Sequence, residues 1–254
     1  MDDLTLAAEL VRAAGTLASS MLREGLETQY KTSVSDVVSA ADHAAEELIA
    51  SRLAAERPDD GLVGEEGTRS TGDRTWVIDP VDGTYNFLSG VPYWCSAVGL
   101  SDNSGPLLGA VYYPALDRLW TGQRGKGCRE DGKPVPPLVD QPLSEVSVAT
   151  YSHPAHLRNH VRYAAWLSAV GAAATVRMFG SASVDLASVA SGRLGVFLQV
   201  NLSDWDWVPG AALVTAAGGR AVTTVIADNR WHIAGNAQAV AEVEEALLRG
   251  VAAA

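Results

Sequence analysis

The chain has 254 residues, of which 47% are hydrophobic and 19% charged, and this composition is typical of a globular protein with a substantial core. Its formal net charge of −11 disfavours nucleic acids and anionic membranes as partners, and no apolar run has the length needed to cross a bilayer. Two cysteines are too few for a disulfide framework, and the acidic start Met1-Asp2-Asp3 lacks the basic segment of a secretory signal, so a cytoplasmic protein is expected.

The first half of the chain is predicted to form two helices followed by strands. Apolar residues at helical spacing predict a helix from residue 4 to about 25. A second helix is predicted from about Ser39, where Ser39 and Asp42 have the spacing of a capping box, to about Arg57, because Pro58 would end it. Short strands are predicted at residues 62–63 and 76–78, and antiparallel strands between residues 96 and 120.

Prolines near the middle of the chain predict a boundary between two subdomains of a single domain, about 1–142 and about 143–254. These prolines are Pro134, Pro136, Pro137 and Pro142. Beyond them, strands alternate with helices. The strands are predicted near residues 146–150 and 195–200, and the helices at about 157–169, 182–191, 206–217 and 237–248. Strands followed by alternating strands and helices predict a layered fold of the mixed α/β (α+β) class.

An acidic turn follows the strand at residues 76–78 and carries the most informative pattern in the sequence. Asp79 and Asp82 lie three residues apart in a turn that also contains proline and glycine. Both carboxylates and the backbone carbonyl of Val81 can converge there on one point. Hard oxygen ligands of this kind suit Mg²⁺ rather than zinc. The alternative interpretation is a solvated acidic turn capped by Asp82.

Gly83 and Thr84 follow the acidic turn and are predicted to begin a helix. Their free backbone amides could bind a phosphate beside the metal, because a helix N-terminus attracts anions. The negative charge of the chain would otherwise repel a phosphate ester. Bound cations remove this conflict, since they dominate the local field.

Three further acidic segments could contribute to the same site. Glu65-Glu66 follows the strand at 62–63, and it could add a carboxylate or form a surface turn. Asp206 precedes an apolar helix, and it could be a metal ligand or only a helix cap. Asp42 could take part in the chemistry or only cap the second helix.

Taken together, these segments resemble the inositol monophosphatase family. Residues 76–87, WVIDPVDGTYNF, match the family's first signature, WxIDPxDGTxNF, at every fixed position. Glu65-Glu66 resembles the family's GEE element, and residues 31–42 resemble its K-x4-D-x5-D element. Residues 205–219 are similar to its second signature, WD…AGG. The resemblance runs from about residue 4 to about 248, and it implies a layered αβαβα sandwich, usually dimeric. It also implies a Mg²⁺-dependent phosphomonoesterase that is often inhibited by lithium.

The resemblance implies a role for individual residues. The ligands of two to three Mg²⁺ ions, for which Mn²⁺ could substitute, would be Glu65, Asp79, the Val81 carbonyl, Asp82 and Asp206. The residues that activate the attacking water would be Asp42, Glu65 and Thr84, with Asp42 and Thr84 acting as a pair. The substrate would contact Asp82, Gly83, Thr84, Ser181, Ala182, Gln199 and Asp206. A mobile loop linked to the metals would carry Lys31 and Asp36.

Four positions depart from the pattern of the inositol-selective members of this family. Gln199 stands where those members carry a glutamate, Gly195 stands where an aspartate is frequent, and Val208 and Pro209 replace small residues. The expected substrate is therefore inositol monophosphate or a related sugar or polyol phosphate. Histidinol phosphate, fructose 1,6-bisphosphate and a 3′-phosphoadenosine nucleotide are alternatives. A catalytically idle binding or regulatory module is the alternative from a different class.

Overall fold

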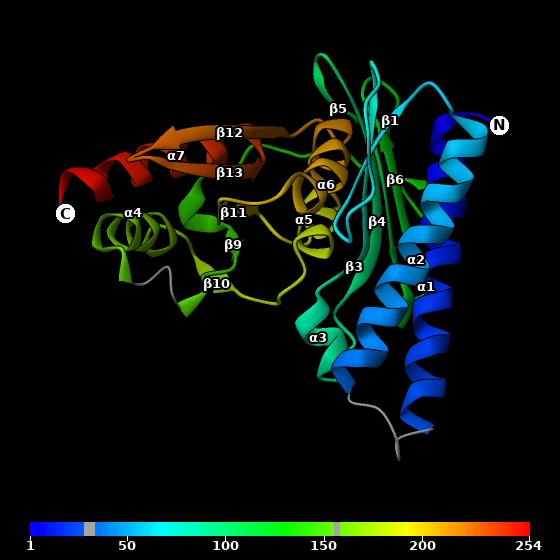
Figure 1. Ribbon diagram of the computed structural model, residues 1–254. Helices are drawn as coiled ribbons and strands as arrows, with labels where there is room; N and C mark the ends of the chain where they lie inside the picture. The colour runs from blue at the N-terminus through cyan, green and yellow to red at the C-terminus, as the bar shows by residue number, and fades with distance from the viewer. Residues whose placement is uncertain (28–33, 155–157) are drawn as a thin grey trace.

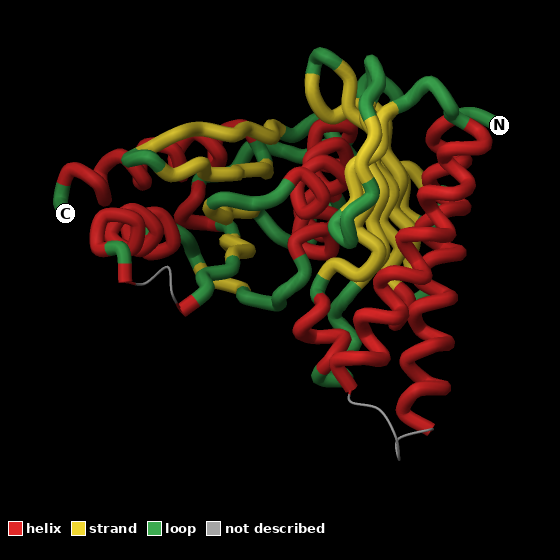
Figure 2. Tube along the Cα trace, in the orientation of Figure 1, coloured by secondary structure: helices red, strands yellow, loops and turns green. Residues whose placement is uncertain are grey.

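The structure is a computed structural model of the chain, and it describes residues 1–27, 34–154 and 158–254, with side chains outside 25–39. Its elements stack in five layers of helices, sheet, helices, sheet and helices (Figures 1 and 2). Helices α1 (Asp3–Glu27) and α2 (Val34–Glu56) cover the outer face of the larger sheet. Helices α5 (Ala182–Ala190) and α6 (Asp204–Ala216) lie between the two sheets, and α4 (His160–Gly171) and α7 (Ala237–Ala252) lie outside the smaller sheet. This is the predicted αβαβα sandwich.

Within the described residues, the larger sheet has eight strands in the order β2-β1-β3-β4-β5-β6-β7-β8, and only the β1–β3 pair is parallel. Its strands are β1 (Gly61–Gly64), β2 (Arg69–Ser70), β3 (Thr75–Asp82), β4 (Cys95–Asp102), β5 (Gly105–Tyr113), β6 (Arg118–Gln123), β7 (Gly127–Glu130) and β8 (Lys133–Pro134). The short helix α3 (Thr84–Leu88) follows β3, and the 3-10 helix η1 (Pro114–Leu116) joins β5 to β6.

The smaller sheet has five strands in the order β10-β9-β11-β13-β12. Strand β9 runs parallel to β10 and β11, whereas β13 is antiparallel to β11 and β12. Its strands are β9 (Ser147–Thr150), β10 (Thr175–Arg177), β11 (Val196–Val200), β12 (Arg220–Ile226) and β13 (Asn229–Gly235), and the 3-10 helix η2 (Leu143–Glu145) precedes β9.

Strand β3 shows why the larger sheet lies between two helical layers. Successive side chains of a strand point to opposite faces, and both faces of β3 are apolar. Trp76 and Ile78 pack with the α1–α2 layer, while Val77 packs with the α5–α6 layer. The sequence therefore buries this sheet on both sides. Burial of each large apolar side chain stabilises the folded chain by roughly 1.5–3 kcal/mol.

A row of glycines seats α6 on the larger sheet. Gly99, Gly109 and Gly122 are neighbours across β4, β5 and β6 in the sheet register. A Cβ atom on Gly109 would lie 2.0 Å from the carbonyl oxygen of Pro209, and one on Gly99 would lie 2.8 Å from a methyl group of Val208. Backbone and helix can approach this closely only because these side chains are missing. The row thereby fixes the position of α6.

Two predictions about helix starts are wrong. Helix α2 begins at Val34, so the positions of Ser39 and Asp42 lie inside the helix and do not form a capping box at its start. Helix α6 begins at Asp204 with Ser203 as its N-cap, so Asp206 is not the cap. The carboxylates of Asp42 and Asp206 are therefore available for a role other than capping.

None of the helices in the described part of the chain combines the length and the apolar character that a membrane span needs.

We propose that the chain is one domain with subdomains of about 1–142 and about 143–254. Every described strand up to Pro134 belongs to the larger sheet, and every described strand from Ser147 onward belongs to the smaller one. Helix α6 crosses this division, because it comes from the second subdomain and packs on the sheet of the first. The division therefore leaves one continuous core between the sheets.

Candidate functional site

Two buried aspartates and a partly buried one, from distant parts of the chain, meet at the junction between the sheets. Asp79 and Asp82 lie at the end of β3, and Asp206 lies in the first turn of α6. Each offers an oxygen, and the three oxygens lie within 4.8 Å of one another. In a regular strand, residues three apart would face opposite sides. The β3–β4 register shifts between the pairs Asp79–Ala97 and Asp82–Cys95, and this bulge turns both carboxylates to one side.

The N-terminus of α5 holds Asp82 in place. The backbone N–H of Ala182 donates to Asp82 Oδ1 at 3.1 Å, and that of Ser183 donates to Oδ2. The Ser181 side chain caps the same helix by accepting from the N–H of Val184. A helix N-terminus stabilises a negative charge, so this contact fixes the direction of a carboxylate that is only 5% exposed.

A second helix positions the segment that carries Glu65. Glu65 lies near enough to Asp79 for the two side chains to shift each other's pKa. The carboxylate of Glu46, on α2, accepts the backbone N–H groups of Glu66 at 2.8 Å and Thr68 at 2.9 Å. Glu46 is buried, and a Cβ atom on Gly64 would lie 2.4 Å from its carboxyl group. Glu46 therefore ties the turn after β1 to α2 and sets the place of Glu65.

Asp42 and Thr84 do not form the expected pair in this structure. The Thr84 hydroxyl donates to the carbonyl of Val81 at 3.2 Å. Asp42 is buried, and its Oδ1 has no hydrogen-bond partner in the described part of the chain. Asp42 nevertheless lies close to the other acids, because its charge acts on both Glu65 and Asp79. The acidic cluster thus consists of Asp42, Glu65, Asp79, Asp82 and Asp206.

Burial raises the pKa of every carboxyl group in this cluster. Burial, with a smaller contribution from neighbouring carboxylates, raises the pKa of Asp42 and Asp206 to about 8 and that of Glu65 to about 7. The pKa values of Asp79 and Asp82 are raised for the same first reason. Five such groups cannot all ionise at neutral pH unless a positive charge compensates them.

A divalent cation fits this arrangement of donors. The converging ligands are carboxylate oxygens, which are the ligands that Mg²⁺ and Mn²⁺ prefer. Asp79 is 1% exposed, and its Oδ1 has no hydrogen-bond partner among the described residues. A buried carboxylate oxygen without a partner is costly, and coordination of a cation would satisfy it.

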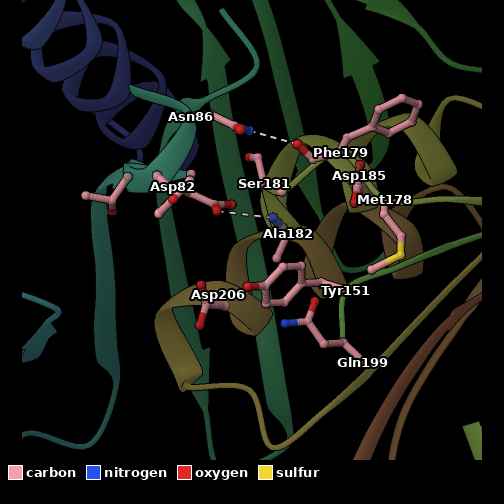
Figure 3. Close-up of a pocket in the computed structure, with 14 residues that line it drawn as sticks. Asp82, Asn86, Tyr151, Met178, Phe179, Ser181, Ala182, Asp185, Gln199 and Asp206 are labelled. Carbon is pink, nitrogen blue, oxygen red and sulfur yellow. Dashed lines mark hydrogen bonds between the residues drawn. The ribbon is translucent and has the colours of Figure 1, made fainter. Parts of the chain in front are cut away.

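The aspartate cluster opens onto a cavity of about 510 Å³ (Figure 3). This volume lies within the usual range for sites that bind small molecules. The acidic turn, the α5 N-terminus and β11 contribute its walls. The lining residues are Asp82, Gly83, Thr84, Tyr85, Asn86, Tyr151, Met178, Phe179, Gly180, Ser181, Ala182, Asp185, Gln199 and Asp206.

A sequence model of the inositol monophosphatase family matches residues 1–252 of the chain. The chain belongs to this family. An Inositol-1-monophosphatase of Rhizobium meliloti (strain 1021) is 39% identical over 189 residues, which are 72% of this chain and 71% of that relative. The Nus factor SuhB of Xylella fastidiosa (strain Temecula1 / ATCC 700964) is 34% identical over 219 residues, 83% of this chain and 78% of that relative. The solved structure of inositol monophosphatase from Anabaena (Nostoc) sp. PCC 7120 has a TM-score of 0.83 at 28% identity, and the match covers 97% of this chain and 95% of that chain.

The structure shows where this member of the inositol monophosphatase family carries the four residues that depart from the pattern of the inositol-selective members. Gly195 is required by packing, because a Cβ atom there would lie 2.2 Å from Cβ of Val146. Val208 and Pro209 contact the glycines of the larger sheet. These three residues are absent from the described lining of the cavity, whereas Gln199 is part of it. Gln199 is therefore the one departure of the four that can contact a substrate directly.

Two acidic residues of the site are not among those predicted from the sequence. Glu46 holds the turn that carries Glu65, and Asp185 lines the cavity. Both are buried acids on helices with apolar neighbours at helical spacing, and that signal could have marked them. Lys31 lies outside the described residues, so its place on a mobile loop stays a prediction. The expectation that Asp36 lies in that loop is wrong, because its backbone belongs to α2; its side chain lies outside the described part of the chain.

Proposed function

We propose that this protein is a Mg²⁺-dependent phosphomonoesterase whose substrate is inositol monophosphate or a related sugar or polyol phosphate. The observation that carries the proposal is the convergence of Asp79, Asp82 and Asp206 beside a cavity of suitable size. Membership of the inositol monophosphatase family supports the same reaction class.

The acidic cluster supplies the ligands for the metal in this proposal. The ligands would be Glu65, Asp79, the Val81 carbonyl, Asp82 and Asp206, around two to three Mg²⁺ ions or Mn²⁺ in their place. Bound ions of this kind act as Lewis acids on a phosphoryl group and lower the pKa of water. Asp79 and Glu65 shift each other's pKa and both have raised pKa values, which supports their sharing of cations.

The residues around the cavity would bind the ester and move its protons. The amides of Gly83 and Thr84 would hold the phosphate, while Ser181, Ala182 and Gln199 would contact the alcohol. Glu65, with Asp42 and Thr84, would orient the attacking water and accept its proton. For Thr84 to donate to Asp42, its side chain must first release the Val81 carbonyl. The water oxygen then forms the new P–O bond, the ester P–O bond breaks, and the alcohol leaves with a proton.

A panel of phosphate esters tests this proposal directly. Phosphate release is measured with inositol 1-phosphate, histidinol phosphate, fructose 1,6-bisphosphate and 3′-phosphoadenosine 5′-phosphate, each with Mg²⁺ and with EDTA. We expect release that requires Mg²⁺ and is fastest for inositol 1-phosphate. Faster release from another ester would replace the substrate and keep the reaction class. No release from any ester at any Mg²⁺ concentration would refute the proposal.

The idle-module alternative is weaker because the acidic cluster fits a metal. It has one observation in its favour, which is the similarity to a protein named Nus factor SuhB. Calorimetry with Mg²⁺ and Mn²⁺ distinguishes the two, since an idle module that had lost its metal site would show no binding. The cytoplasmic location, the homodimer and the inhibition by lithium stay predictions.

A further inference from the structure

Asp185 is a buried carboxylate in the cavity wall to which the proposed hydrolysis gives no role. It lies one turn into α5, is 3% exposed, and belongs to the lining of the cavity. Figure 3 shows it beside Met178 and Phe179, on the other side of Ser181 and Ala182 from Asp82. It is therefore placed to meet the alcohol part of an ester whose phosphate lies at the metal end.

A tyrosine holds this carboxylate in a fixed position. The Tyr93 hydroxyl donates to Asp185 Oδ1 at 2.7 Å. The Tyr93 ring packs between Phe179, at 4.9 Å between ring centroids, and Tyr113, at 5.8 Å. Packing of this kind restricts the ring, so the hydroxyl keeps its direction. A carboxylate can accept several hydrogen bonds, so the bond from Tyr93 leaves Oδ2 able to accept one from a ligand.

The charges of the cavity select for the same kind of ligand. Three aspartates, Asp82, Asp185 and Asp206, line it, and the described lining contains no lysine or arginine. Metal ions at Asp82 and Asp206 would compensate those two charges and leave Asp185 without a cation. Burial raises the pKa of Asp185 to about 8, and in its ionised form the buried carboxylate favours a hydrogen-bond donor and repels a second anionic group.

Resting on the proposed function, we propose that Asp185 determines substrate specificity by accepting a hydrogen bond from a hydroxyl or ammonium group on the alcohol part of the ester. Tyr93 is the positioning residue that orients Asp185. The preferred substrate therefore carries one phosphate, at least one donor on its alcohol part, and no second anionic group. Fructose 1,6-bisphosphate and 3′-phosphoadenosine nucleotides are disfavoured on this ground, because each carries a second phosphate.

Three esters built on one ring separate the contribution of the donor from that of the ring. Inositol 1-phosphate carries hydroxyl donors, 4-aminocyclohexyl phosphate carries an ammonium donor, and cyclohexyl phosphate carries none. We expect the Asp185→Asn variant to lose roughly tenfold to hundredfold more kcat/KM on one or both donor esters than on cyclohexyl phosphate. This is the size of one hydrogen bond to a charged group. The ester that loses more identifies the donor as hydroxyl or ammonium.

Tyr93→Phe provides a second variant that keeps the carboxylate. We expect it to reduce the same preference for donor esters by a smaller factor, and mainly through KM. Asp117→Asn and Tyr112→Phe are matched controls, because the Tyr112 hydroxyl donates to Asp117 at 3.1 Å in a pair outside the cavity lining. Both controls should keep the wild-type ratio between donor esters and cyclohexyl phosphate.

The outcomes distinguish this inference from the proposed function. Equal losses on all three esters in Asp185→Asn, with the folded structure retained, would overturn the role of Asp185 and leave the hydrolysis intact. Wild-type preference for fructose 1,6-bisphosphate over inositol 1-phosphate would also overturn it. Absence of Mg²⁺-dependent release from every ester in the wild type would instead refute the proposed function.

Discussion

The buried carboxylates at the junction between the two sheets lower the stability of the metal-free chain. Asp79 is nearly inaccessible to solvent, its Oδ1 has no partner among the described residues, and its pKa is raised by burial and then by the charges of Asp82 and Glu65. No basic side chain is among the described groups that shift this pKa. Such a residue lowers the free energy of unfolding of the metal-free chain, and a bound cation reverses that effect.

We predict that Asp79→Asn lowers kcat by roughly a thousandfold or more, because it removes a main electrostatic element of the site. In EDTA, the same variant should melt at the same or a higher temperature than the wild type, since it removes one of several mutually repelling carboxylates. Phosphate release and thermal melting measure the two effects. Asp73→Asn, at an exposed position, is the control. Turnover close to that of the wild type would contradict the metal assignment.

Two contacts between elements place the proposed metal ligands that come from outside β3. Glu46 ties the turn after β1 to α2, and the row of glycines at positions 99, 109 and 122 seats α6 on the sheet. The first contact sets the position of Glu65 and the second that of Asp206. Helix packing, rather than the local sequence around each ligand, therefore decides whether the cluster assembles.

Glu46→Ala should weaken the response to Mg²⁺. The variant leaves two backbone N–H groups without their acceptor, each of which costs about 1–3 kcal/mol if it stays buried. We expect the turn that carries Glu65 to loosen and the Mg²⁺ concentration for half-maximal activity to rise roughly tenfold. Glu46→Gln should give a smaller rise, because its amide oxygen can still accept one bond. Glu47→Ala, at the neighbouring exposed position, is the control and should leave the Mg²⁺ response unchanged. If the Mg²⁺ concentration for half-maximal activity rose equally in Glu47→Ala, that result would argue against the role of Glu46.

The Gly109→Ala substitution should separate α6 from the sheet. Its methyl group would lie 2.0 Å from the Pro209 carbonyl oxygen, so either the helix or the strand must move. Overpacking of this kind costs about 1–3 kcal/mol, occasionally more. We expect a lower melting temperature together with weaker Mg²⁺ binding, because α6 carries Asp206. Gly171→Ala, which meets no atom within 4 Å, is the control for a harmless added methyl group.

Across the whole molecule, the site lies where the two sheets and the helices between them meet. Asp79 and Asp82 come from the larger sheet, while Asp206 comes from a helix of the second subdomain. A cation bound by all three would link the two subdomains, so the stability of the whole chain should depend on metal.

The raised pKa values predict how the stability of the metal-free chain changes with pH. Burial raises the pKa of Asp42 and Asp206 from the ordinary 3.8 to about 8, and the pKa of Glu65 from 4.5 to about 7. Between about pH 4 and 8 the folded chain therefore holds more protons, and rising pH favours unfolding. We predict that the melting temperature in EDTA falls between pH 5 and 8, and that Mg²⁺ raises it more at pH 8 than at pH 5. A melting temperature in EDTA that rises over this interval would contradict the prediction.

The sequence by itself determined the family, the layered fold class and the acidic turn. The signature at residues 76–87 is contiguous, and the uninterrupted apolar run Trp76-Val77-Ile78 in β3 indicates a strand that is buried on both faces. Local patterns of this kind depend on residues that are close in sequence, so they can be read without a structure.

Only the tertiary structure decided which acids meet and what each one touches. The bulge that turns Asp79 and Asp82 to one side, the α5 amides on Asp82 and the Tyr93–Asp185 hydrogen bond all join residues from different strands, loops and helices. The capping patterns at Asp42 and Asp206 were misleading, because the helices begin earlier than those patterns indicate. Contacts between distant segments depend on how whole helices pack on sheets, and the residues on either side of each acid carry no record of that packing.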